Sequence, residues 1–117
     1  MELIILDGND DISHVQLRGS LDTAAMRGID ARFLGATAAQ DRPAIVDLSE
    51  LHYITSIGIG MLLGCAKTLR HKGHQLILVA PIPAVEHVLR TVGMDDVVPI
   101  VASAQEALRL ARSAPAS

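Results

Sequence analysis

The sequence predicts an α/β domain with a mostly parallel, mixed sheet of about five strands, an antiparallel edge strand and about four helices. Short apolar runs such as Ala44–Leu48 and Gln75–Ala80 suit strands covered on at least one face, and segments with helical periodicity separate them. This alternation favours parallel strands with right-handed crossovers. The 117 residues are 50% hydrophobic, which is enough for one core and too apolar for a disordered chain.

The first elements are two strands and a helix. Glu2–Leu6 and Ser13–Arg18 are predicted strands, and Asp7–Asp11 between them is dense in turn-forming residues, so the first strand should reverse onto the second. Asp22 can cap the following helix, which ends before Pro43. Its apolar residues recur at helical spacing and should form the buried stripe: Leu21, Ala25, Ile29, Phe33 and Ala36.

A second strand-to-helix unit occupies the middle of the chain. After the strand Ala44–Leu48 and a loop, a helix should run from about Ile57 to Lys72, where Gly73 ends it. Its apolar face is predicted to be Ile59, Leu62, Leu63, Ala66 and Leu69. Met61, Cys65 and Thr68 fall off this face, so Met61 is expected on the outward face of the helix, where it would either contact a partner or pack under the neighbouring loop.

The remaining elements repeat the pattern. Gln75–Ala80 is a strand, Pro83 opens a short helix that Gly93 closes, and Val97–Val101 is a last strand. Ser103–Glu106 is a capping box for a final helix. These elements should share one core that includes Ile45, Val46, Leu62, Leu63, Leu76, Leu78 and Val88.

Composition excludes several classes of function. The net charge is −3, there is no basic run, and Phe33 and Tyr53 are the only aromatic residues, so a nucleic-acid binder is not expected. The longest apolar run, Ile57–Ala66, is far short of the ~20 residues that a membrane helix needs, and the N-terminus lacks the basic region of a signal peptide. The lone Cys65 fits a reducing cytoplasm. We therefore expect one cytoplasmic domain, residues 1–117, with a frayed tail from 113 to 117.

The junction between strand and helix in Ile45–Gly60 holds two hydroxyls, Thr55 and Ser56. Backbone N–H groups are unpaired at a helix N-terminus, so this is where α/β proteins place functional groups. Three chemical patterns fail here or nearby. A dinucleotide fingerprint would need a third glycine where Leu63 stands, a hydrolase nucleophile elbow would need glycine in place of Ile54, and a calcium loop at Asp7 would need glycine in place of Ile12. No cofactor, metal site or catalytic residue is expected, and the chain is not predicted to be an enzyme.

The same junction resembles the STAS domain of bacterial anti-sigma factor antagonists. The residues that carry the resemblance are Asp47-Leu48-Ser49, Tyr53-Ile54 and Thr55-Ser56-Ile57-Gly58-Ile59-Gly60. Further matches are Gly19-Ser20-Leu21-Asp22, Gly73-His74-Gln75-Leu76 and Thr91-Val92-Gly93-Met94, so the resemblance covers nearly the whole chain. In many relatives the phosphorylated serine stands where this chain has Ile57. The hydroxyls left in this loop are those of Ser56 and Thr55. The resemblance therefore transfers the regulatory role to Ser56, with Thr55 as second choice.

As a STAS protein, the chain would be a stand-alone anti-anti-sigma factor in a partner-switching pathway. Its unphosphorylated form would bind a serine kinase of the histidine-kinase-like ATPase type, which doubles as the anti-sigma factor, and so release the sigma factor. Phosphorylation at Ser56 would end binding, and a PP2C-type phosphatase would reset the switch. The partner-binding residues implied are Ser20, Leu21, Asp22, Thr23, Thr55, Ser56, Ile57, Gly58 and Met61.

Two other functions remain open from the sequence. Some STAS domains resemble this chain and serve as non-switching adaptor subunits docked on an ATPase, for instance of a lipid-transport ABC system, where a hydroxyl near Thr55 supports binding. A sensor of a small ligand or nucleotide is the third functional hypothesis. Neither nucleic acid nor a membrane is an expected partner.

Overall fold

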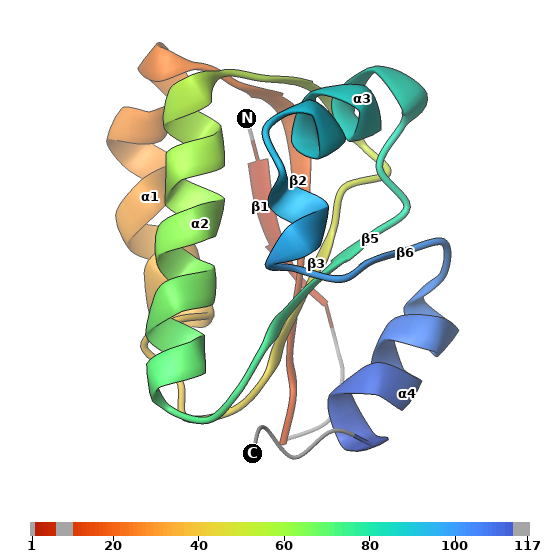
Figure 1. The fold of residues 1–117 in the computed structure, drawn as a ribbon. Coiled ribbons are helices and arrows are strands. Elements are labelled where there is room, and N and C mark those ends of the chain that lie inside the picture. The colour runs from red at the N-terminus through yellow and green to blue at the C-terminus, as the bar shows by residue number, and fades with distance from the viewer. Residues whose placement is uncertain (1, 7–10, 114–117) are drawn as a thin grey trace.

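The computed structural model, which describes residues 2–6 and 11–113, consists of a six-stranded sheet with helices on both faces (Figure 1). The strands are β1 (Glu2–Ile5), β2 (Ser13–Leu21), β3 (Ala44–Asp47), β4 (Leu51–Ile54), β5 (Leu76–Val79) and β6 (Ile100–Val101). The helices are α1 (Thr23–Ala36), α2 (Ser56–His71), α3 (Pro83–Thr91) and α4 (Ala104–Ser113), with a short 3-10 helix η1 (Met94–Asp96). In this described part, no helix is both long and apolar enough to cross a membrane.

The sheet has the order β1-β2-β3-β5-β6, and only β1 is antiparallel to its neighbour. Leu3 pairs with Leu17 across β1 and β2, while β3 pairs in parallel with both β2 and β5. The predicted mixed sheet with an antiparallel edge strand is therefore confirmed. Of the turn predicted at Asp7–Asp11, residues 7–10 lie outside the described part of the chain, as do residues 114–117 of the predicted tail.

Strand β4 was not predicted. The first half of β2 pairs with β3, and its last residues, Gly19–Leu21, pair with β4. Between β3 and β4 the chain makes a turn in which the Ser49 N–H donates to Asp47 Oδ1 at 2.8 Å. His52 and Tyr53 are exposed, so β4 lacks the apolar run that marks a covered strand. Strand β4 extends the sheet along β2 and ends at Ile54, so that only Thr55 separates it from the first residue of α2.

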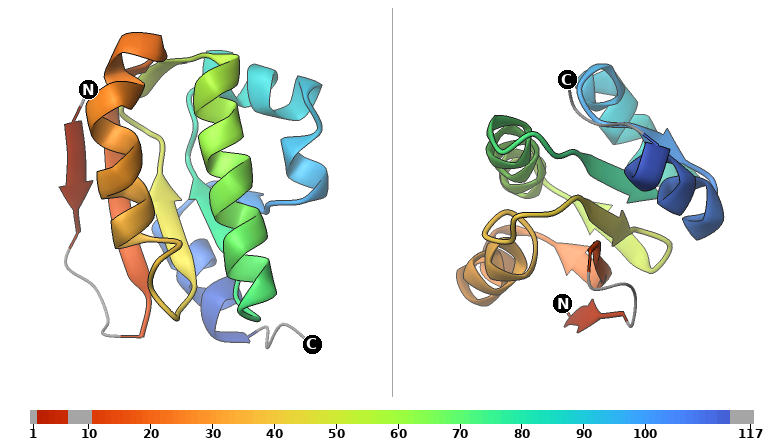
Figure 2. Two further views of the ribbon diagram at one scale, coloured as in Figure 1. Left: turned by 90° about the vertical axis from the view of Figure 1, so that its left-hand side faces the viewer. Right: turned by 90° about the horizontal axis from the view of Figure 1, so that it is seen from below.

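Side chains on the two faces of the sheet form two separate cores. Helices α1, α2 and α3 cover one face, where the buried side chains include Val15, Leu17, Leu21, Phe33, Val46, Leu62, Leu78 and Leu89. Helix α4 covers part of the other face and packs on Ile12, Ile45, Ile77, Val79 and Val101 (Figure 2, right). Successive residues of a strand point to opposite faces, so Ile45 and Val46 belong to different cores. The expectation of a single core was wrong in this respect, and Leu63 and Val88 are only partly buried.

The last predicted strand, Val97–Val101, is shorter than expected. Backbone N–H groups of Val97 and Val98 donate to the Met94 carbonyl, which winds this segment into the end of η1 and leaves only Ile100–Val101 to pair with β5. The first strand-to-helix connection is also tighter than predicted, because β2 continues to Leu21 and α1 follows two residues later.

Candidate functional site

The predicted site lies where the carboxyl ends of β2 and β4 meet the N-terminus of α2. Thr55 connects the three elements, since its backbone N–H and its hydroxyl both donate to the Leu21 carbonyl, at 3.0 and 3.1 Å. The same hydroxyl accepts the Gly58 N–H in a long contact of 3.5 Å. Thr55 has an extended backbone and is the N-cap of α2. The residue that caps α2 is therefore Thr55 and not the adjacent Ser56.

Gly58 lies on the inner side of this first turn and is buried. A Cβ atom at this position would stand 2.8 Å from Cγ and Cδ2 of Leu21 and 3.0 Å from Cγ1 of Ile54. Both neighbours are buried, so neither can move aside freely. The glycine therefore lets the helix start pack directly on the ends of β2 and β4.

Ser56 is the first residue of α2 and is exposed. Among the described residues, its hydroxyl has no hydrogen-bond partner, in contrast to that of Thr55. It stands at the positive end of the helix dipole, a position that suits an anion. Two large apolar side chains on either side of it in sequence are also exposed, Tyr53 by 57% and Ile57 by 47%. This combination of a free hydroxyl and exposed apolar surface is suited to a binding surface that a phosphate could alter.

The other predicted partner-binding residues divide into surface and interior positions. Ser20 and Asp22 are half-exposed at the end of β2, and the side chain of Thr23, which begins α1, lies outside the described part. Leu21 and Gly58 are buried and form the floor beneath the surface, so neither offers a side chain to a partner. Tyr53 served only as a motif marker in the sequence, but it is the most exposed aromatic residue near Ser56, and in β4 it pairs with Ser20. The sequence signal for this exposure was that an aromatic residue stands in a segment that otherwise looks polar and loop-like.

Met61 was expected on the outer face of α2, and this was wrong, because the side chain is only 7% exposed. Helix α2 packs on α1 as well as on the sheet, so its buried face is wider than the stripe predicted from one contact surface. Cys65 is buried on the same side, and its thiol lies 3.3 Å from the Thr37 hydroxyl. Burial raises the pKa of the Cys65 thiol above its usual value, which disfavours a reactive thiolate.

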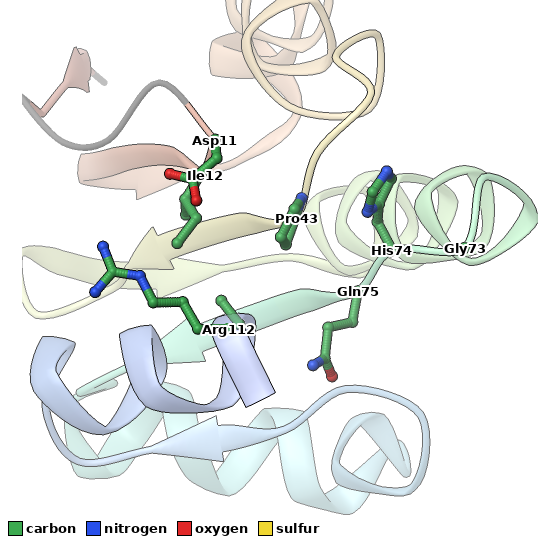
Figure 3. Close-up of a pocket in the computed structure, with 8 residues that line it drawn as sticks. Asp11, Ile12, Pro43, Gly73, His74, Gln75 and Arg112 are labelled. Carbon is green, nitrogen blue, oxygen red and sulfur yellow. The ribbon is translucent and has the colours of Figure 1, made fainter. Parts of the chain in front are cut away.

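A cavity of about 540 Å³ lies at the opposite end of the sheet, where the strands begin (Figure 3). Its lining includes Pro43 and Gln75, which precede β3 and β5, and two of its polar side chains, Gln75 and His74, interact with other residues of the protein. The Gln75 amide donates to the Leu110 carbonyl at 3.3 Å, and His74 lies 2.9 Å from the Asp41 carboxylate. The described residues contain no cluster of histidine, cysteine or acidic side chains suited to a metal ion.

Comparisons with known proteins agree on one family. The family described as "STAS domain" matches residues 4–107. A candidate anti-sigma factor antagonist, BtrV of Bordetella bronchiseptica, is 27% identical over 104 residues, which cover 89% of this chain and 90% of BtrV.

Solved structures show the same fold at low identity. An anti-sigma factor antagonist from Mycobacterium paratuberculosis superposes with a TM-score of 0.82 at 24% identity, over 96% of both chains. The anti-sigma factor antagonist SpoIIAA in its unphosphorylated form gives a TM-score of 0.79 at 24% identity, over 97% of this chain and 98% of SpoIIAA. Its phosphorylated form, from Bacillus, gives 0.68 over 95% of this chain and 100% of that one, also at 24% identity.

Proposed function

The chain belongs to the STAS domain family, and from this premise we propose that it is an anti-sigma factor antagonist whose binding is switched by phosphorylation of Ser56. In its unphosphorylated form it binds a serine kinase of the histidine-kinase-like ATPase type that also acts as the anti-sigma factor. The bound kinase releases its sigma factor. Phosphorylation of Ser56 by the same kinase separates the two proteins, and a PP2C-type phosphatase restores the binding form.

The observation that carries this proposal is the difference between two adjacent hydroxyls. The Thr55 hydroxyl is engaged with Leu21 and Gly58, whereas the Ser56 hydroxyl is exposed and without a hydrogen-bond partner in the described structure. A kinase active site needs a hydroxyl that it can reach and reorient. Ser56 meets this requirement without disturbing the fold. The relatives BtrV and SpoIIAA carry the name of anti-sigma factor antagonist, and SpoIIAA has a phosphorylated form.

Phosphate at Ser56 would act on the binding surface rather than on the fold. It adds roughly −1.5 to −2 charges, which the helix N-terminus can accept through its dipole and free N–H groups. The dianion and its hydration shell would stand on the surface that exposes Tyr53 and Ile57. Asp22, which follows the Leu21 carbonyl bound by Thr55, is half-exposed and adds repulsion. A loss of ~3 kcal/mol in binding would lower affinity more than a hundredfold, enough to exchange partners.

In this proposal the protein is a regulatory binding protein of the cytoplasm and not an enzyme. The kinase and the phosphatase carry the chemistry, and the STAS domain supplies the hydroxyl and the surface. No cofactor takes part on its side.

The test is the binding behaviour of Ser56 variants in the organism's own cell extract. Affinity-tagged wild type, Ser56→Ala and Ser56→Asp are purified, and the proteins retained are identified by mass spectrometry. We expect Ser56→Ala to retain the kinase and Ser56→Asp to lose it, although one charge mimics two only in part. Ser103→Ala, which removes an exposed hydroxyl at the start of α4 and outside both proposed binding surfaces, is the matched control and should behave as wild type.

The same experiment distinguishes the adaptor function. A non-switching adaptor would retain a transporter ATPase in all variants, and incubation of the complex with ATP would leave the STAS protein unphosphorylated. That outcome would contradict the partner-switching proposal.

A further inference from the structure

Helices α1 and α2 lie side by side (Figure 2, left). A groove runs between them on the outer surface. The groove has a volume of about 450 Å³ and a mainly apolar lining: Leu34, Gly35, Ala38, Ala39, Gly60, Met61, Gly64, Thr68 and Lys72. The groove ends where the chain leaves the two helices: Lys72, which follows α2, donates from Nζ to the carbonyl of Ala38, which follows α1, at 2.7 Å. No described element covers this surface.

Three glycines in the lining are not required by close packing against other described residues. A Cβ atom at Gly35, Gly60 or Gly64 would meet no other atom within 4 Å. Gly60 and Gly64 lie inside α2, where glycine costs about 1 kcal/mol relative to alanine, and Gly35 is the next-to-last residue of α1. The glycines keep the floor of the groove low, which allows the backbone of another molecule to approach closely.

Helices α1 and α2 are more basic than the rest of the molecule. Residues 23–36 and 56–72 contain five of the chain's ten lysine and arginine residues and one of its thirteen acidic residues, although the chain as a whole carries −3. Arg27, Arg32 and Lys67 are exposed and have no ion-pair partner in the described structure. Lys67 precedes the lining residue Thr68, and Arg32 lies three residues before Gly35, so both flank the groove.

We propose that this groove binds an acidic amphipathic helix of a protein partner. Apolar side chains of that helix would fill the groove, and carboxylates along its edges would pair with Arg32 and Lys67. The low floor matches the close approach of packed helices, whose axes lie about 8–10 Å apart. A second copy of this chain fits poorly, because its equivalent surface is cationic as well. A membrane fits poorly too, since none of the large exposed apolar side chains (Ile5, Tyr53, Ile57, Val92 and Val97) lines the groove.

The groove begins at Gly60, one turn of α2 after Ser56, and the proposed binding does not require modification of Ser56. The test uses the full chain labelled with 15N and a synthetic helix with leucine and alanine on one face and glutamate on both flanks. We expect the peptide to shift the backbone amide signals of Gly35, Gly60 and Gly64. The same peptide with lysine in place of glutamate should produce no such shifts.

Two variants and two matched controls define the site. Lys67→Glu and Gly64→Leu should each weaken peptide binding about tenfold or more, the first by charge and the second by filling the groove. Space for a Cβ atom at Gly64 means that the second variant should fold, and circular dichroism checks this. Arg109→Glu and Gln105→Leu make the same kinds of change at exposed positions of α4 and should leave binding unchanged.

Three results would overturn the proposal. The first is the absence of shifts at the groove glycines with excess glutamate peptide. The second is equal binding of the glutamate and lysine peptides. The third is co-sedimentation with phosphatidylglycerol vesicles that Lys67→Glu abolishes while the peptide fails to bind, since this would assign the cationic surface to an anionic membrane.

Discussion

The inner and outer sides of the first turns of α2 differ in the contacts that their residues make with the rest of the fold. On the inner side, Thr55 ties the helix to β2, Gly58 lies against Leu21, and Leu62 is fully buried. On the outer side, Ser56 and Gly60 are exposed and meet no such constraint. The contrast teaches that the hydroxyl available for modification is the one that the fold does not use. Substitutions on the two sides should therefore have opposite profiles, with large effects on stability inside and on binding outside.

The largest expected effect on stability is that of Leu62→Ala on the inner side. Truncation of this fully buried leucine leaves a cavity in the core beneath α2 and should lower the free energy of unfolding by about 2–5 kcal/mol. Urea denaturation followed by circular dichroism measures it. Leu63→Ala, at the half-buried neighbouring position, is the control and should cost less. Equal losses in the two variants would contradict the assigned orientation of α2.

Gly58→Ala should come next. The new methyl group would stand 2.8 Å from Leu21 and should destabilise the fold by about 1–3 kcal/mol, partly offset by the better helix propensity of alanine. Gly60→Ala, one half-turn away on the outer side, meets no atom within 4 Å and should be neutral or stabilising. The comparison fails if both alanines change the midpoint of thermal unfolding in the same direction by the same amount.

Thr55→Ala should have a smaller effect, with a cost of about 1–2 kcal/mol for the loss of the cap and of the bond to Leu21. Thr55→Ser keeps the hydroxyl and should recover most of this stability. A serine variant as unstable as the alanine variant would show that the methyl group of Thr55, and not its hydroxyl, matters to the fold.

Ser56→Ala is expected to have the smallest effect on stability, within about 0.5 kcal/mol of wild type, because the exposed hydroxyl has no hydrogen-bond partner among the described residues. A calorimetric scan of both proteins under the same conditions tests this. A loss as large as that of Thr55→Ala would mean that Ser56 also supports the helix start.

Most of the fold could be predicted because hydrophobic periodicity and turn residues mark each element locally. Strand β4 could not, since His52 and Tyr53 are exposed and only the pairing of β4 with the far end of β2 makes it a strand. The division of Ile45 and Val46 between two cores follows from strand geometry, but the existence of the second core depends on where α4 packs.

The candidate site was predictable as a region but not in the orientation of its side chains. Motif order located Thr55 and Ser56, yet which of them caps the helix is decided by the Leu21 carbonyl, 34 residues away from Thr55 in sequence. Met61 was misplaced for a similar reason, because its burial comes from contact between α1 and α2. Long-range contacts of this kind leave no trace in local spacing.

The most direct test of the central claim is to locate the phosphate after reaction with the kinase that co-purifies with the protein. Wild type, Thr55→Ser and Ser56→Ala are incubated with this kinase and ATP, and the peptides are analysed by fragmentation mass spectrometry. We predict phosphate on Ser56 in the first two proteins and none at the junction in Ser56→Ala, which should still bind the kinase. Phosphate on residue 55 alone, with Ser56 unmodified, would contradict the account, because it would mean that the hydroxyl engaged by the fold is the one that is switched.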